Sequence, residues 1–237
     1  MIVANTVLHI SKDKLLERLG KIDDLTVVQI GGSDPYEISK AILILQEMGC
    51  KNFNLNVGCP SSRVQKGCFG AILMKDKELV CNIVNTVHIV LGVDEHDSYD
   101  FFHDFVSYLI KKSPVNTFYV HGRKCWLDGL SPKQNRNIPS LNYDFVYRIK
   151  KEFPKINFIL NGGLKGVKDF DKLLFKDLFL DGMMIGREIV KEYLNEFDPS
   201  HPISFRILNP LQHILHGKKG TKRWKVFLNE AVHKKKL

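Results

Sequence analysis

Three features are missing from this sequence, and each absence argues against a class of protein. The five cysteines, at positions 50, 59, 68, 81 and 125, form no C-x-x-C pair and no regular framework, which argues against a disulfide scaffold or a zinc ribbon. The N-terminal MIVANTVLHISKDK has neither a basic region before its apolar residues nor a clear cleavage site, so it does not read as a secretory signal. No apolar run is long enough to cross a bilayer.

These absences indicate a protein from a reducing compartment. We expect a cytoplasmic monomer with no bound metal and no membrane partner. An organellar location is the alternative, if the natural chain carries a further N-terminal segment.

The composition is that of a soluble globular protein with a basic balance. Hydrophobic residues make up 44% and charged residues 26%, and 35 Lys+Arg against 26 Asp+Glu give a formal charge of +9. This charge would attract an acidic partner such as nucleic acid, although a merely basic protein would have the same balance. The chain's 237 residues suffice for one large domain, or for a main domain with a small appendage.

Apolar, β-branched runs alternate with amphipathic helical segments along most of the chain. Segments 35–49 and 99–112 have the apolar spacing of helices. This alternation predicts an α/β fold with a parallel sheet or a TIM-type (β/α)8 barrel. The runs that read as strands buried on both faces are 25–32, 52–58, 115–122, 156–163 and 178–186.

After residue 186 the alternation stops. Segments 187–197 and 222–237 read as helices, separated by the linker-like DPSHP. The basic HKKK near the C-terminus fits a solvated helix end, and an RNA contact is the alternative.

Polar and glycine residues stand at the ends of several predicted strands. In a parallel barrel such residues meet at the carboxyl ends of the strands, where functional groups gather, so we expect one shared site. The last two groups, Asn-Gly-Gly and Gly-Arg, favour phosphate binding by glycine backbone N–H groups and the Arg187 guanidinium. The residues at these strand ends are Gln29, Asn56, Cys59, His121, Asn161, Gly162, Gly163, Gly186 and Arg187.

Among the cysteines, only Cys59 follows a strand directly into this predicted site. Cys50 and Cys81 fit packing positions, whereas Cys68 and Cys125 lie in loop-like segments and stay ambiguous. A free thiol is mostly protonated at neutral pH, so Cys59 could act as a general acid. A packing role is the alternative.

Several long motifs resemble the tRNA-dihydrouridine synthases, in particular the branch that acts on the D-loop. They are LNVGCPSSRVQKGCFGAILMKD, YVHGRKCWLDGLSPKQNRNIPSLNYDFVYRIKKEFP, NGGLKGVKDF and DGMMIGRE, supported by VVQIGGSDP and LGVDEHDSYDF. The resemblance implies a TIM-barrel enzyme that reduces the C5–C6 double bond of a tRNA uridine with FMN, using NADPH to reduce the flavin. It also implies that Cys59 donates a proton to C5.

The same resemblance implies roles for the other residues. Gln29, His121, Asn161, Gly162, Gly163, Gly186 and Arg187 match FMN-contacting positions. Asn56 matches a contact to the target nucleotide, and Lys133 and Arg136 match contacts to tRNA. A uridine must leave its stack to reach a flavin, and basic groups around the site could hold the RNA backbone.

The chain also departs from the family pattern. The segment MIVANTVLHI matches the end of the family's second strand, so we expect residues 1–196 to form a barrel lacking its first strand. Near residues 82–99 a full strand with a Val-Lys-x-Arg segment is expected to be missing. Residues 203–237 are expected to be part of a helical tRNA-binding domain.

Two other functions are compatible with these departures. A noncatalytic tRNA-binding remnant, or a truncated gene product without flavin, would fit the missing Lys/Arg segment. A flavin barrel acting on a small molecule would fit the phosphate site but leave Lys133, Arg136 and the basic C-terminus unexplained.

Overall fold

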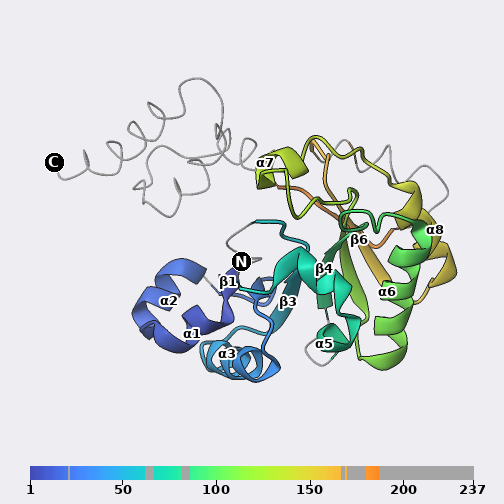
Figure 1. Ribbon diagram of the computed structural model, residues 1–237. Coiled ribbons are helices and arrows are strands. Elements are labelled where there is room, and N and C mark those ends of the chain that lie inside the picture. Colours follow the sequence, from blue (N-terminus) through green and yellow to red (C-terminus); the bar gives the residue numbers. More distant parts are fainter. Residues whose placement is uncertain (21, 62–66, 82–85, 167–168, 170–179, 187–237) are drawn as a thin grey trace. The chain divides into compact units, whose positions relative to one another are not determined.

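A sheet of parallel strands forms the centre of the structure, a computed structural model that describes residues 1–20, 22–61, 67–81, 86–166, 169 and 180–186 (Figure 1). Its strands follow one another in chain order, each pairing in parallel with the next. This arrangement confirms the predicted α/β class of an incomplete TIM barrel. The strands are β1 (Ile2–Val3), β2 (Val27–Gly31), β3 (Asn52–Val57), β4 (Thr86–Val90), β5 (Thr117–His121), β6 (Asn157–Asn161) and β7 (Gly182–Met184).

Strand β4 occupies the place where the sequence pattern predicted a missing strand, so that prediction was wrong. Val87 pairs with Leu55 of β3 and Phe118 of β5, which places β4 between these two strands. The run Thr-Val-His-Ile-Val is β-branched enough to form a ladder without the basic residues of the family pattern. The short β1, in contrast, agrees with the predicted strand end at the N-terminus.

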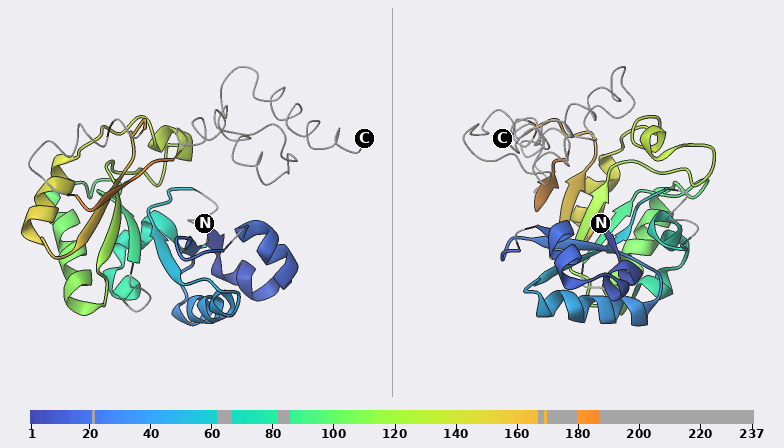
Figure 2. Two further views of the ribbon diagram at one scale, coloured as in Figure 1. Left: turned by 180° about the vertical axis from the view of Figure 1, so that it is seen from behind. Right: turned by 90° about the vertical axis from the view of Figure 1, so that its left-hand side faces the viewer.

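Helices connect these strands, and three of the described helices, which start at Pro35, Tyr99 and Pro132, have a side-chain cap at their N-terminus. The carboxylate of Asp34 accepts the backbone N–H groups of Tyr36 and Glu37 at 2.8 and 3.1 Å, and proline takes the first helical position of α3. Helices α6 and α8 lie side by side in both Figure 1 and the rear view of Figure 2, and Tyr99 contacts Phe145 edge-on at 5.2 Å between ring centroids. The helices are α1 (Ala4–His9), α2 (Lys12–Leu19), α3 (Pro35–Glu47), the 3₁₀ helix η1 (Gly70–Lys75), α5 (Lys77–Cys81), α6 (Tyr99–Lys112), α7 (Pro132–Asn135) and α8 (Asp144–Glu152).

The two faces of the sheet differ in chemistry. The register places Leu55, Phe118 and Phe158 in one row, and the rings of the two phenylalanines stack at 5.4 Å. Most described residues of this apolar face are buried; they include Val28, Ile30, Leu55, Val57, Ile89, Phe118, Val120, Phe158 and Leu160. It is the face that parallel α/β folds cover with helices.

In β5 and β6 the opposite face corrects the expectation of strands buried on both faces, whereas the second half of β3 confirms it. Along β5 and β6 buried residues alternate with half-buried ones, among them Tyr119, His121, Ile159 and Asn161. The register puts Gln29, Asn54 and Asn56 on this same face. It therefore presents amide and imidazole groups rather than a second apolar layer.

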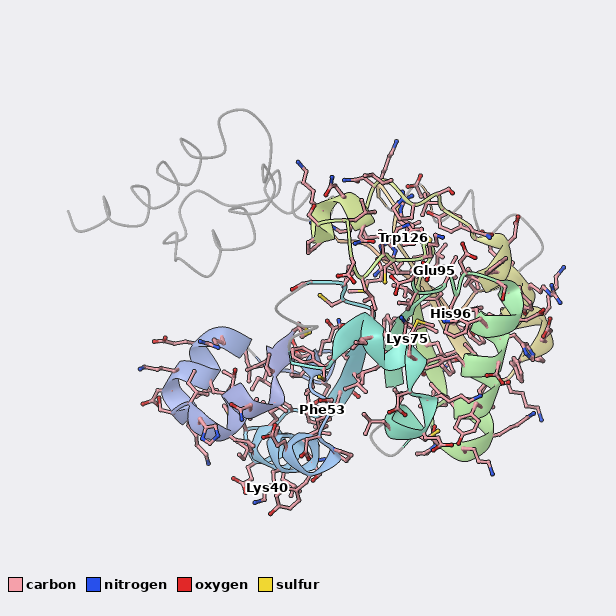
Figure 3. The ribbon with its side chains drawn as sticks, in the orientation of Figure 1. Lys40, Phe53, Lys75, Glu95, His96 and Trp126 are labelled. Atoms are coloured by element: carbon pink, nitrogen blue, oxygen red, sulfur yellow. The ribbon has the colours of Figure 1, made fainter. Side chains whose placement is uncertain are left out.

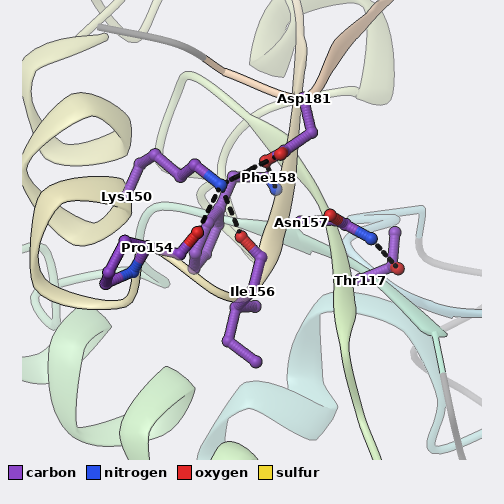
Figure 4. Close-up of polar contacts among 7 residues, drawn as sticks. All are labelled: Thr117, Lys150, Pro154, Ile156, Asn157, Phe158 and Asp181. Carbon is purple, nitrogen blue, oxygen red and sulfur yellow. Dashed lines mark hydrogen bonds and ion pairs between the residues drawn. The ribbon is translucent and has the colours of Figure 1, made fainter.

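A half-buried cation stabilises the end of the sheet at which β6 begins (Figure 4). The Lys150 ammonium donates to the carbonyl oxygens of Pro154 and Ile156 at 3.1 and 2.9 Å and contacts the Asp181 carboxylate at 2.8 Å. The same carboxylate accepts the backbone N–H of Phe158 at 2.7 Å. This cluster ties the end of α8 to the segment before β7.

The chain divides into two compact units. The first comprises Met1–Gly163 and Lys168–Met184 and holds the whole described sheet; the second comprises Leu164–Val167 and Ile185–Leu237. In the second unit the structure describes residues 164–166 and 185–186, so the helical domain predicted for 203–237 lies outside the described residues. Within the described ranges, no helix has both the length and the apolar character needed to span a membrane.

Candidate functional site at the carboxyl ends of the strands

Cys59 is held in place by the strand that precedes it. The Asn56 side chain turns back so that its Oδ1 accepts the backbone N–H groups of Gly58 and Cys59 at 3.2 and 2.9 Å. The Cys59 carbonyl in turn accepts the backbone N–H of Ala71 at 3.1 Å. This turn, common for asparagine, directs the chain out of β3 and leaves the Cys59 thiol half-buried.

A row of side-chain amides runs from this turn back into the sheet. Asn56 Nδ2 donates to Gln29 Oε1 at 2.9 Å, and Gln29 Nε2 donates to Asn54 Oδ1 at 3.0 Å. Asn54 and Asn56 are 4% and 6% exposed, so these bonds are well shielded from water. We call Asn54, Gln29 and Asn56 the amide row.

His121 ends strand β5 beside the end of β6. Its register partner is Asn161, whose carbonyl oxygen lies 3.4 Å from His121 Nδ1. Burial lowers the pKa of His121, the hydrogen bond to Asn161 opposes this, and the charges of Arg123 and Arg136 lower it further. The imidazole is therefore neutral at pH 7 and can donate or accept a hydrogen bond.

The two glycines after β6 allow the turn to pack closely against neighbouring side chains, including this imidazole. Gly162 and Gly163 have φ angles of +95° and +75°, which other residues rarely adopt. A Cβ on Gly162 would lie 2.1 Å from His121 Nδ1, and one on Gly163 would lie 2.8 Å from the Tyr143 hydroxyl. That hydroxyl donates to the Gly162 carbonyl at 2.6 Å, so the turn is both closely packed and fixed.

The long segment between β5 and α8 carries the predicted RNA contacts. Helix α7 begins with a capping box between Ser131 and Gln134. Lys133 lies within this helix, and Arg136 is the residue that ends it. The Asn135 side chain, 3% exposed, exchanges hydrogen bonds with the backbone N–H and carbonyl of Trp126 at 2.7 and 2.8 Å. Trp126, in the segment that leads to α7 (Figure 3), is thereby braced against this helix.

The five cysteines differ in how far they are exposed to solvent. Cys50 and Cys125 are each 2% exposed, and burial, helped by the negative charge of Asp94, raises the pKa of Cys125 to about 12. Cys68 is exposed. The ambiguity about Cys125 is thus settled in favour of packing, and Cys59 keeps its position at the end of β3.

Most of the predicted site residues that the structure describes fall at one edge of the sheet. Gln29 and Asn56 bond directly, Asn56 holds Cys59, and His121 contacts Asn161. Gly186 belongs to the second unit, and Arg187 lies outside the described residues, so the predicted Gly-Arg phosphate contact is not placed.

Sequence reasoning missed two residues of this edge. Asn54 anchors the amide row, and Tyr143 supports the glycine turn. The spacing of Asn52, Asn54 and Asn56 in a strand, at every second position, could have identified Asn54, because such residues share one face. No comparable signal precedes Tyr143.

A parallel α/β sheet with a thiol, amides and an imidazole at the carboxyl edge has its polar groups where TIM-barrel enzymes have their active sites. The chain belongs to the dihydrouridine synthase (Dus) family, whose model matches residues 1–192. This is a family of flavin-dependent oxidoreductases.

Similar curated proteins are each named tRNA-dihydrouridine(20/20a) synthase. That of Pasteurella multocida is 33% identical over 274 aligned positions, covering 99% of this chain and 82% of the relative. That of Yersinia pestis is 34% identical over 99% of this chain and 78% of the relative, and that of Vibrio parahaemolyticus is 44% identical over 68% and 52%. Since 274 positions exceed the 237 residues of this chain, the first relative carries residues within the aligned region that have no counterpart here.

Proposed function

We propose that this protein is a tRNA-dihydrouridine synthase that reduces the C5–C6 double bond of a D-loop uridine, with FMN as cofactor and NADPH as reductant. The observation that carries the proposal is the match to relatives of this name over 99% of the chain. The thiol at the end of β3 agrees with it, because such a reduction needs a proton donor at a fixed place.

The described residues fit a flavin at this edge of the sheet. Gln29, His121 and Asn161 would hold it through neutral polar groups, and the absence of a Cβ on Gly162 lets the turn after β6 pack closely against His121. The phosphate contact is proposed for Gly186 and Arg187 from the match to the family alone. When bound, the reduced cofactor would supply the hydride.

Cys59 would donate the proton to C5 of the uracil, and Asn56 would orient the base. Both lone pairs of Asn56 Oδ1 are engaged by backbone N–H groups, and one amide hydrogen goes to Gln29. Asn56 can therefore offer a ligand only its second N–H, which suits a carbonyl oxygen such as those of uracil.

Lys133 and Arg136 would hold the tRNA backbone while the uridine leaves its stack. Both belong to the segment braced by Asn135 and Trp126, so their backbone positions are fixed before RNA binds. Binding through these residues should weaken as salt rises.

The test is dihydrouridine formation in unmodified tRNA with FMN and NADPH, measured by nucleoside mass spectrometry. The wild type should form dihydrouridine, Cys59→Ala should lose at least about 100-fold in rate while still binding FMN, and Cys68→Ala should resemble the wild type. Unchanged formation in Cys59→Ala would refute the role of this thiol. A colourless protein that shifts tRNA but forms no dihydrouridine would instead identify a noncatalytic RNA-binding protein.

A further inference from the structure

The direction of the hydrogen bonds in the amide row is forced from one end. Only an oxygen can accept from the two backbone N–H groups of Gly58 and Cys59, so Asn56 must turn its Oδ1 toward them and its Nδ2 toward Gln29. Gln29 must then present Oε1 to Asn56 and Nε2 to Asn54. The row therefore needs an acceptor at position 54, and Asn54 Oδ1 supplies it at 3.0 Å.

We propose that Asn54 is a positioning residue for Cys59, acting through Gln29 and Asn56. Asn54 is 4% exposed, so water cannot readily replace its oxygen. Without this acceptor Gln29 would leave a shielded N–H unpaired and would turn away, and Asn56 would lose the partner that fixes its orientation. The turn that carries Cys59 would then open more easily, although Asn54 itself does not contact the Cys59 backbone in any hydrogen bond of the described structure.

Thiol alkylation tests this without cofactor or RNA. Purified chain is treated with iodoacetamide, and the rates at Cys59 and Cys68 are followed separately by peptide mass spectrometry. Asn54→Leu and Asn54→Ala both remove the oxygen; the first keeps the side-chain volume and the second reduces it. Asn52→Leu is the matched control, because Asn52 lies on the same strand face but is exposed and bonds to the Asp24 carbonyl instead.

We expect the alkylation rate of half-buried Cys59 to rise about fivefold in Asn54→Leu and Asn54→Ala. This is the change expected when the turn opens more easily by the free energy of about one hydrogen bond. Exposed Cys68 should react at the wild-type rate in every variant. Asn52→Leu should leave Cys59 as in the wild type. Equal Cys59 rates in the wild type and in a folded Asn54→Leu or Asn54→Ala would overturn the proposal.

If neither variant folds, amide hydrogen exchange of the wild type decides the question. The row predicts that the Gly58 and Cys59 amides are protected, and exchange at the rate of free loop amides would overturn it. The importance of Cys59 in this inference rests on the proposed function, but different results would refute the inference and the function. Absence of dihydrouridine would refute the function, whereas an unchanged Cys59 alkylation rate would refute the positioning role.

Discussion

His121 occupies the space that a side chain at Gly162 would need: a Cβ there would lie 2.1 Å from His121 Nδ1. Gly129 has a similar φ of +80°, but a Cβ at this position would meet no atom within 4 Å among the described residues. Comparing the same substitution at these two glycines therefore separates the free-energy cost of the backbone conformation from that of the close contact with His121.

Gly129→Ala should reduce the free energy of unfolding by about 1–2 kcal/mol, the cost of a left-handed conformation for an L-residue. Gly162→Ala should lose a further ~2 kcal/mol, because the imidazole and the new methyl group cannot both fit. Urea unfolding of both variants measures the difference. Equal losses would show that His121 moves aside at no cost.

The lowered pKa of His121 predicts a pH-dependent stability. Above the unfolded pKa of about 6.5 the imidazole is neutral in both states, and its contribution is fully present. As the pH falls below this value, the unfolded chain takes up the proton first, so the free energy of unfolding decreases until the pH has passed the folded pKa.

His121→Gln should remove this part of the pH dependence. Urea unfolding between pH 8 and pH 5 should show the wild type losing stability more steeply than the variant, by at most about 1.4 kcal/mol per pH unit for one proton. Parallel curves would contradict the inference that burial keeps this imidazole neutral.

Asn56→Asp should impair dihydrouridine formation more than it impairs folding. An aspartate still accepts from the Cys59 N–H, but its second oxygen faces Gln29 Oε1 and no N–H is left for a uracil carbonyl. We expect a loss of about tenfold or more in kcat/KM, the effect of at least one buried hydrogen bond. Asn52→Asp, an exposed change on the same strand, should be near wild type; equal losses in the two would argue for a general effect of charge on β3.

The Lys150 cluster should contribute to stability rather than to catalysis. Lys150→Met leaves the Asp181 carboxylate without its cation and should cost about 2 kcal/mol of unfolding free energy. Lys151→Met, an exposed neighbour, should stay within about 0.5 kcal/mol. Dihydrouridine formed per folded molecule should not change in either variant, and a selective loss in Lys150→Met would show that this end of the sheet affects the site.

Local patterns in the sequence were sufficient to predict much of the fold. The β-branched runs that became β2, β3, β5 and β6 were predicted within a few residues, and the position of Cys59 after a strand followed from them. Strand β4 was missed because the absence of basic residues was given more weight than its own β-branched run. The alternation in Thr-Phe-Tyr-Val-His, which indicates one half-buried face, was likewise overlooked.

The contacts that fix the site depend on strand register. Gln29 and Asn54 are separated by 25 positions, and only the pairing of β2 with β3 brings their amides together. Tyr143 and Gly162 are separated by 19 positions, and they follow β5 and β6, which pair side by side. Neither partner carries a local signal of the other.

The lengths of the outermost strands have a consequence for behaviour at high concentration. Among the described residues β1 and β7 pair on one side only, and they span two and three residues. A strand edge is a template on which another chain can add its own backbone, and a template this short offers few hydrogen bonds. Among the described residues β3, β4 and β5 lie between two longer strands, and this protects their apolar residues from intermolecular pairing and aggregation.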